Sequence, residues 1–205
     1  MPVLTLASSK GGAGKTTVAA LIAGTLASEG VDVHAVDADP NQALTRWVQK
    51  TWEGRRFECH AEPDENRLAS LLETLQQTQP TVVVDTAGFG NRAATIAMMM
   101  SDAVLIPLGA SEADVTEAEK TLASVRTLST AMRRTIQATL LLNKVKQRTV
   151  IARHVEQETA ELPRLAATLS DFVGYQDMTY SGRLPAAGSR AAEETSALMA
   201  ELRQA

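Results

Sequence analysis

A glycine-rich run directly after an apolar segment constrains this chain more than any other feature. Residues 10–17 read Lys-Gly-Gly-Ala-Gly-Lys-Thr-Thr, and the apolar segment before them covers residues 3–7. The apolar segment predicts a buried strand, and the residues after the run predict a helix over 15–29 that ends at Gly30. The backbone N–H groups of such a turn lie at the positive end of the helix, where they bind phosphate. The run therefore predicts a nucleotide-binding P-loop.

The side chains of this loop have distinct expected tasks. Lys15 should reach the β- and γ-phosphates, the Thr16 hydroxyl should bind Mg²⁺, and Thr17 should support the α-phosphate. Ser9 stands where the common pattern has its first glycine. A glycine turn with a purely structural role is the competing interpretation, and the Gly-Lys-Thr-Thr sequence disfavours it. The phosphate-binding amides are expected from Gly11, Gly12, Ala13 and Gly14.

Beyond the loop, the chain alternates between short apolar runs and helical patterns. Strands are predicted at residues 3–7, 31–36, 57–61, 81–84, 103–107 and 138–142. Helices are predicted at residues 15–29, 43–50, 67–77, 91–100, 112–131, 149–161 and 190–203. Continuous apolar strands are typical of parallel sheets covered on both faces. The pattern predicts one domain over residues 1–205, with a doubly wound, mostly parallel α/β sheet flanked by helices.

Two of these strands end in acidic residues, at the edge where α/β sheets bind ligands. Asp85 closes an apolar strand in a Walker B pattern and is expected to hold Mg²⁺. Asp37 and Asp39 follow the strand at 31–36, where carboxylates suit contact with water or a hydrated metal. Capping of a helix that begins near Asn41 is the alternative role for Asp39. Residues 86–90 (Thr-Ala-Gly-Phe-Gly) are expected to rearrange as a switch when a γ-phosphate binds.

Composition excludes several classes of protein. Cys59 is the single cysteine, which excludes an internal disulfide and any Cys-x-x-Cys metal or redox site. The N-terminal residues do not resemble a signal peptide, and no apolar stretch approaches the ~20 residues of a membrane span. The segment 190–205 lacks the basic amphipathic pattern of a helix that binds membrane surfaces. We therefore expect a cytoplasmic protein without a membrane role.

The formal net charge of −4 conceals a basic window at 120–155. This window contains eight basic residues and neither Asp nor Glu, so the remaining residues carry 12 basic against 24 acidic groups. Such a window is a candidate surface for DNA phosphates, and solvated helix faces are the alternative explanation. The basic residues are Lys120, Arg126, Arg133, Arg134, Lys144, Lys146, Arg148 and Arg153.

A second lysine at the start of the loop, Lys10, identifies a more specific resemblance. Together with residues 43–47 (Ala-Leu-Thr-Arg-Trp), 101–107 (Ser-Asp-Ala-Val-Leu-Ile-Pro) and 141–144 (Leu-Leu-Asn-Lys), it resembles the ParA/MinD family of deviant Walker A ATPases. The chain is most similar to the small, ParF-like plasmid-partition proteins, which lack the N-terminal DNA-binding extension of larger ParA proteins. The resemblance is good to about residue 145 and looser afterwards.

The resemblance implies roles for individual residues. Lys10 is expected to cross an ATP-bound dimer and contact the partner's nucleotide, much as an arginine finger does. Asp39 is expected to position the attacking water, and Asp37 to support the Mg²⁺ shell. The adenine is expected near Asn143 and residues 169–171.

The resemblance also implies a function. We expect a weak Mg²⁺-dependent ATPase that hydrolyses ATP to ADP and phosphate and partitions or positions plasmid or chromosomal DNA. ATP should drive formation of a homodimer that binds DNA without sequence preference, associates with the nucleoid and responds to a centromere-binding, ParB-like partner. The alternatives are a ParA-like ATPase that assists conjugal or virulence DNA transfer, and an ATP-dependent biosynthetic synthetase on the same fold.

Overall fold

The computed structural model describes residues 3–78, 81–88 and 91–204. Its strands form one parallel sheet in the order β3-β2-β4-β1-β5-β6-β7. The strands are β1 (Val3–Leu6), β2 (Val33–Asp37), β3 (Glu58–Ala61), β4 (Thr81–Asp85), β5 (Ala103–Leu108), β6 (Gln137–Val145) and β7 (Arg164–Ser170). The sheet places β4 between β1 and β2, so the ends of these three strands are adjacent.

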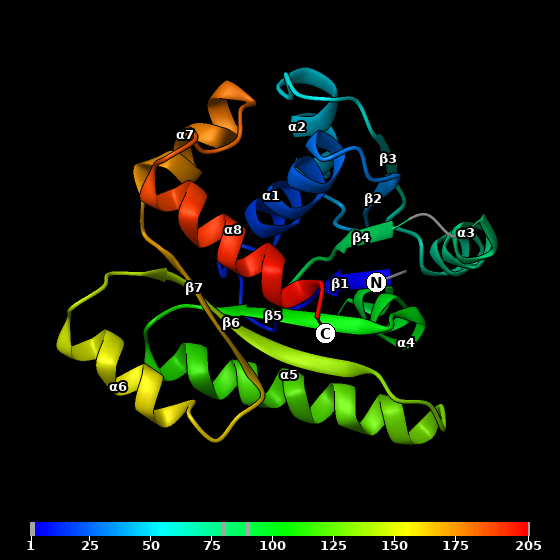
Figure 1. The fold of residues 1–205 in the computed structure, drawn as a ribbon. Helices are drawn as coiled ribbons and strands as arrows, with labels where there is room; N and C mark the ends of the chain where they lie inside the picture. The colour runs from blue at the N-terminus through cyan, green and yellow to red at the C-terminus, as the bar shows by residue number, and fades with distance from the viewer. Residues whose placement is uncertain (1–2, 79–80, 89–90, 205) are drawn as a thin grey trace.

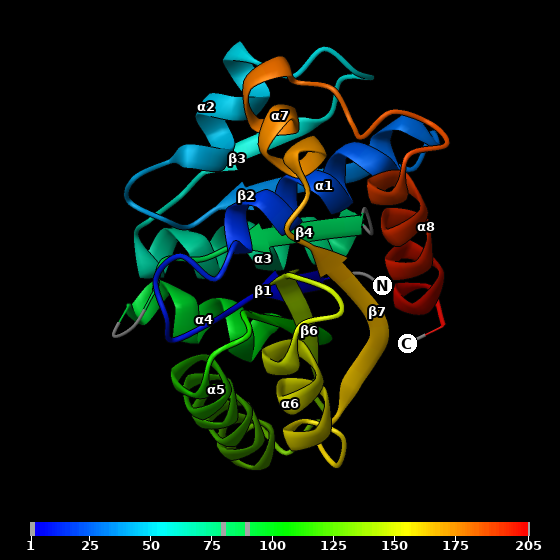
Figure 2. The same cartoon turned by 90° about the vertical axis from the view of Figure 1, so that its left-hand side faces the viewer.

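Helices cover both faces of the sheet (Figures 1 and 2). One face carries α1 (Lys15–Ser28), α2 (Ala43–Lys50), α7 (Val173–Ser181) and α8 (Arg190–Leu202). The other face carries α3 (Glu65–Thr78), α4 (Arg92–Met100), α5 (Glu112–Ala131) and α6 (Val150–Glu158). Among the described residues, no helix is both long enough and apolar enough to cross a membrane.

The doubly wound parallel sheet confirms the predicted fold class, but two elements were not predicted. In β7, side chains that face the core at Leu165, Ala167 and Leu169 alternate with more exposed ones, because this edge strand is covered mainly on one face. It therefore lacks the continuous apolar run of the central strands. In α7, only Tyr175 and Met178 are buried, so the helical pattern is weak.

The connection after α7 depends on a glycine. Gly182 has a left-handed φ of +67°, and its carbonyl accepts a hydrogen bond from the Glu53 N–H at 3.0 Å. A Cβ on Gly182 would lie 1.7 Å from the Thr51 carbonyl oxygen, which is too close for any side chain. Gly188 also has a left-handed φ, of +77°, but a Cβ there would meet nothing within 4 Å.

These two glycines give a matched stability prediction. Gly188→Ala should cost about 1 kcal/mol, because only the left-handed backbone disfavours alanine. Gly182→Ala should cost clearly more, because the added methyl group also overlaps the Thr51 carbonyl oxygen. Urea unfolding of both variants measures the difference, and equal losses of stability would contradict this account of the α2–α7 contact.

Candidate active site

The three segments with predicted phosphate or metal chemistry meet at the carboxyl edge of the sheet. The P-loop follows β1, and Asp37 and Asp85 end the neighbouring strands β2 and β4, where they are paired in register. The Thr86 hydroxyl donates a 2.7 Å hydrogen bond to the Leu6 carbonyl and so joins the ends of β4 and β1. Parallel strands bring these residues together because their carboxyl ends share one edge.

The P-loop leaves the first amides of α1 without a side-chain cap. Helix α1 starts after Gly14, whose φ of +92° is left-handed, and no side chain caps it. By contrast, Asn91, Ser111, Thr149 and Ser189 cap α4, α5, α6 and α8 with side-chain oxygens. Uncapped N-terminal amides are the groups that bind phosphate oxygens.

Residues from β6 and α5 hold the loop in place. Asn143 Nδ2 donates to the Ala13 carbonyl at 2.7 Å, and Lys144 Nζ donates to the Gly12 carbonyl at 2.9 Å. On the other side, the Ser9 hydroxyl lies 2.9 Å from the Thr121 hydroxyl. Lys144, which the sequence predicts as a DNA contact, therefore supports the P-loop in this structure through its hydrogen bond to the Gly12 carbonyl. These supports could not be predicted from the sequence, because Asn143, Lys144 and Thr121 are far from the loop along the chain.

Lys15 is a buried cation in this site. Its side chain is in the first turn of α1, and the residue is only 7% exposed. Burial lowers the pKa of Lys15, while the charges of Asp85 and Asp39 oppose this effect. The Lys15 ammonium thus lies near the carboxylates of Asp85 and Asp39 at the uncapped N-terminus of α1. In this position it can bind a further anion such as phosphate.

Asp85 is fully buried at the end of β4, and among the described residues its carboxylate oxygens make no hydrogen bond of normal geometry, although the Thr16 hydroxyl is close enough to interact with them. Burial raises the pKa of Asp85 to about 7, with a smaller contribution from Asp37, whereas the Thr16 hydroxyl and Lys15 oppose the rise. A buried carboxylate without partners is costly unless a cation or its hydration shell meets it. Asp85 and the Thr16 hydroxyl therefore fit Mg²⁺, which prefers oxygen ligands.

Asp37 organises the turn that follows β2. Its two carboxylate oxygens accept hydrogen bonds from the N–H groups of Thr45, at 2.8 Å, and Asp39, at 3.2 Å. Thr45 is in the first turn of α2, so Asp37 satisfies an amide that a capping residue normally satisfies. Burial raises the pKa of Asp37, and the hydrogen bonds from Thr45 and Asp39 oppose this.

Asp39 is less constrained than Asp37. One of its oxygens, Oδ1, accepts a 2.8 Å hydrogen bond from the Asn41 N–H, while α2 itself begins after Gln42 without a side-chain cap. Asp39 therefore shapes the turn before the helix but does not cap it. The residue is half-buried near Lys15, and that position leaves its carboxylate able to contact a water molecule.

Lys10 is paired within its own chain. Its ammonium lies 2.7 Å from Asp114 Oδ1, and the side chains are 39% and 13% exposed. Asp114 is in the first turn of α5, where its N–H and its carboxylate both bond to the Ser111 hydroxyl. The capping pattern Ser111-x-x-Asp114 is visible in the sequence, but nothing there indicates a contact with Lys10.

A pocket of about 410 Å³ adjoins the loop on the α1 side. It lies between Thr17 and Leu21 of α1 and the segment 169–172 after β7, with Asn143 at its inner end. The predicted adenine-contacting residues therefore line one cavity. Phe172 and Tyr175 also line this cavity. Neither was predicted as a cavity residue, because the helix α7 that begins after Phe172 and contains Tyr175 was not predicted.

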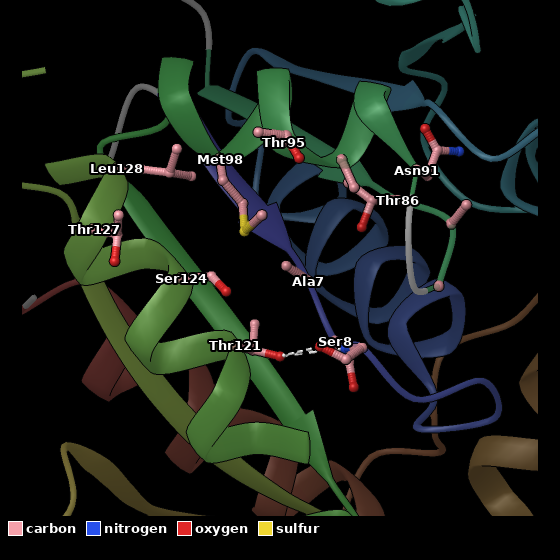
Figure 3. A pocket seen from close by; sticks show the side chains of 14 residues that line it. Ala7, Ser8, Thr86, Asn91, Thr95, Met98, Thr121, Ser124, Thr127 and Leu128 are labelled. Carbon is pink, nitrogen blue, oxygen red and sulfur yellow. Dashed lines mark hydrogen bonds between the residues drawn. The ribbon is translucent and has the colours of Figure 1, made fainter. Parts of the chain in front are cut away.

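A second pocket, of about 380 Å³, lies between α4 and α5 beside the expected switch (Figure 3). Thr95 and Met98 of α4 lie across it from Ser124 and Leu128 of α5. Thr86, Ala87 and Gly88 line its mouth, and Phe89 and Gly90 of the expected switch lie outside the described residues. Movement of the segment after β4 would therefore change the shape of this pocket.

The basic window does not form one surface. Arg134 donates to the Ser101 carbonyl and lies 3.8 Å from Asp102, at the amino ends of the strands. Lys146 and Arg148 follow β6 at the opposite, carboxyl edge, beside the P-loop. The basic residues before β6 and those after it therefore lie at opposite ends of the sheet, because β6 crosses the molecule between them (Figure 1).

Comparison with protein families and curated proteins finds a matching family model and several related proteins. Residues 1–204 match the family model described as VirC1 protein. Protein ParA of Rhizobium radiobacter is 34% identical over 57% of this chain, and the match spans about half (52%) of that protein. Protein virC1 of Rhizobium rhizogenes is 28% identical over 90% of this chain and 83% of its own length. The maintenance of carboxysome distribution protein A of Halothiobacillus neapolitanus is 28% identical, over 97% and 95%.

Solved structures share the fold. MinD in the MinC:MinD cell division complex of Aquifex aeolicus superposes with a TM-score of 0.80 at 18% identity, covering 100% of this chain and 96% of that one. The septum site-determining protein MinD of Pyrococcus horikoshii, complexed with Mg-ADP, superposes with a TM-score of 0.75 at 18% identity, covering 98% and 95%.

The raised pKa of Asp85 predicts a pH dependence of stability. The folded state holds this proton up to about pH 7, whereas an unfolded Asp releases it near pH 3.8. The contribution of Asp85 to the free energy of unfolding is therefore fully present below pH 3.8 and is lost as pH rises through about 7. The total change for Asp85 is at most about 4 kcal/mol.

Asp85→Asn should remove this dependence, because an amide keeps the size of the group and does not titrate. Urea unfolding without metal or nucleotide should show the variant gaining stability over the natural protein between pH 4.5 and 7.5. Parallel pH profiles for the two proteins would show that Asp85 is not an unpaired buried acid.

Proposed function

The chain belongs to the VirC1 protein family of ParA/MinD-type P-loop ATPases, and we propose that it hydrolyses ATP to position or partition DNA. The observation that carries this proposal is the edge of the sheet where the uncapped first turn of α1, the buried Lys15 and the buried Asp85 meet. The uncapped amides and the Lys15 ammonium can bind phosphate, and Asp85, which makes no hydrogen bond of normal geometry among the described residues, can hold the accompanying metal. The similarity to protein ParA and to the maintenance of carboxysome distribution protein A supports a positioning role.

In this proposal each residue acts on a stated part of the nucleotide. The amides of 11–14 and the ammonium of Lys15 bind the phosphates, while Thr16 and Asp85 hold Mg²⁺ with Asp37 behind them. When bound, Mg²⁺ neutralises charge on the β- and γ-phosphate oxygens. Asp39 orients the attacking water, and Asp37 keeps the turn that carries Asp39 in place through its bond to the Asp39 N–H.

The cavity between α1 and 169–172 is the proposed adenine site. Its volume of about 410 Å³ suits a purine, and Asn143 joins this cavity to the loop through the Ala13 carbonyl. Thr17, at the start of the cavity, is placed to contact the α-phosphate. Asn143 of β6 thus contributes both to the site of the base and to the loop that binds the phosphates.

Dimer formation is proposed to change the partner of Lys10. In the single chain Lys10 is held by Asp114, and in the ATP-bound dimer it would contact the phosphates of the partner subunit's nucleotide. The γ-phosphate then supplies the anion that replaces Asp114. ATP favours the dimer because the dimer makes contacts with ATP that a single chain cannot make.

DNA binding is proposed for the part of the basic window at the carboxyl edge. Lys146 and Arg148 lie on the same edge as the nucleotide, and no ion pair involves either of them among the described residues. Arg153 follows on α6. A surface beside the nucleotide can respond to ATP, whereas Arg133 and Arg134 lie at the far end of β6. A ParB-like protein is the proposed partner that stimulates turnover.

A second candidate is a ParA-like ATPase that assists conjugal or virulence DNA transfer. The match to the VirC1 family over residues 1–204 favours it. Both candidates use the same ATP cycle and differ in cargo. A biosynthetic synthetase would instead need a carboxylic-acid substrate for turnover, so ATP hydrolysis stimulated by DNA alone separates it from both.

The Lys10–Asp114 pair tests the proposed dimer. Lys10→Ala should bind ATP normally but lose at least about tenfold in turnover, because the cation supplied by the partner is missing. Asp114→Asn should form the dimer at an ATP concentration about two- to fivefold lower, because a partly exposed ion pair is worth at most about 1 kcal/mol. ATPase assays and analytical ultracentrifugation measure the two effects.

Glu117→Gln is the matched control, since Glu117 is on the same helix and pairs with the exposed Lys120 at 2.6 Å. It should leave dimerisation unchanged. If Asp114→Asn also leaves dimerisation unchanged while remaining folded, Lys10 is not released from Asp114 on dimer formation.

The separation of the basic window tests DNA binding. A Lys146→Glu/Arg148→Glu variant should bind DNA at least about tenfold more weakly with ATP, because phosphate contacts are replaced by repulsion. Arg133→Glu, at the opposite end of β6, should bind almost normally. Fluorescence anisotropy over a range of salt concentrations measures both, and equal losses would place DNA elsewhere.

A further inference from the structure

Two histidines and a glutamate come together on neighbouring strands, outside the nucleotide site. His34 is on β2, and Glu58 and His60 are on the edge strand β3, with His34 paired to Glu58 and Val36 paired to His60 in register. Side chains two residues apart share a face of a strand. The three side chains therefore project from the face on which Val36 packs against α3, and the register, not sequence spacing, brings them together.

The three possible ligand atoms are close enough to share one ion. His34 Nδ1 lies 3.0 Å from His60 Nε2, and Glu58 Oε2 lies 3.6 Å from His60 Nε2 and 3.9 Å from His34 Nδ1. Two atoms that each lie about 2.0–2.2 Å from the same zinc ion are at most about 4.4 Å apart. All three measured distances fall within this limit.

The surroundings of the histidines suit metal binding. The two ring planes are inclined by only 10° with centroids 5.3 Å apart, so the rings meet edge to edge with the two nitrogens between them. Burial lowers the pKa of His60, with a further contribution from His34, and a metal-binding imidazole must be neutral. An Asp32 carboxylate oxygen lies 3.9 Å from the remaining ring nitrogen of His34, which is too long for a hydrogen bond.

We propose that His34, Glu58 and His60 bind a divalent transition-metal ion of the zinc class. Two imidazoles and one carboxylate suit Zn²⁺ and disfavour Mg²⁺, which prefers an all-oxygen shell. Three protein ligands leave a fourth position for water, and the Glu58 side chain is itself 69% exposed. A hydrogen bond between the two rings without a metal is the alternative explanation of the contact.

Metal binding at this place would fasten the edge strand to the strand that carries the active-site turn. Within the described part of the chain, strand β3 pairs only with β2, and β2 ends at Asp37. An ion shared by the two strands stabilises the folded state, and the gain rises with the logarithm of the ion concentration above the dissociation constant, because the ion binds the folded pairing and not the unfolded chain. The proposal is independent of the proposed function, since the metal is distinct from the one held with the nucleotide.

Titration of the tag-free, nucleotide-free chain with ZnCl₂ tests the proposal. Isothermal titration calorimetry should show one Zn²⁺ per chain, and thermal unfolding should shift upward with Zn²⁺ but not with MgCl₂ at the same concentration. His34→Ala and His60→Ala should each weaken binding at least tenfold. Cobalt binding should produce the visible absorption of a low-symmetry, four- or five-coordinate site.

Two control variants sharpen the experiment. His154 on α6 is the third histidine of the chain, and Cys59 projects from the opposite face of β3, where its sulfur lies 3.7 Å from the Thr45 hydroxyl. His154→Ala and Cys59→Ser should both keep the one-to-one binding. Loss of binding in either would place the ion elsewhere and overturn the proposal.

A substitution of the exposed ligand Glu58 keeps the test valid if the histidine variants fail to fold. Glu58→Gln should fold normally, weaken Zn²⁺ binding several-fold and alter the cobalt spectrum. The proposal would be overturned if the natural protein bound no Zn²⁺ when Zn²⁺ is at 100 times the protein concentration. It would also be overturned if both Glu58→Gln and a folded His60→Ala variant bound Zn²⁺ with unchanged affinity.

Discussion

The uncapped first turn of α1 is the constraint on which the rest of the active site depends. Helix α1 is buried in the core, yet its N-terminal amides have no side-chain partner. Such a turn keeps its shape only if other residues hold the loop from outside. Asn143, Lys144 and Thr121 do so from β6 and α5. The loop is thus prepared for phosphate before any ligand binds, and its cost is met by packing elsewhere.

Burial of charge is the second consequence of this arrangement. Lys15, Asp37 and Asp85 are all buried at one edge of the sheet. Burial lowers the pKa of Lys15 and raises the pKa of both aspartates, which in each case favours the neutral form of the group. Asp37 is satisfied by two backbone N–H groups, whereas Asp85 makes no hydrogen bond of normal geometry among the described residues. The site is therefore electrostatically incomplete in one place, and that place is where the sequence pattern predicts the metal.

The fold class and the residues of the loop could be predicted because local chemistry determines both. Apolar runs longer than an alternating pattern indicate strands covered on two faces, and the central strands have them. The edge strand β7 and the short α7 could not be predicted, because partial exposure removes that signal. Likewise, the basic window is continuous in sequence but divided in space, since β6 carries its two parts to opposite edges.

The sequence by itself determined the parallel sheet, the P-loop and the strand ends that carry Asp37 and Asp85, because spacing and residue type within a few residues suffice for these. Only the tertiary structure decided the partners of those residues. Lys10 meets Asp114, Asn143 meets Ala13, and His34 meets His60 across strands. Each contact joins residues far apart in sequence, and the strand order and register that create it depend on the packing of the whole core.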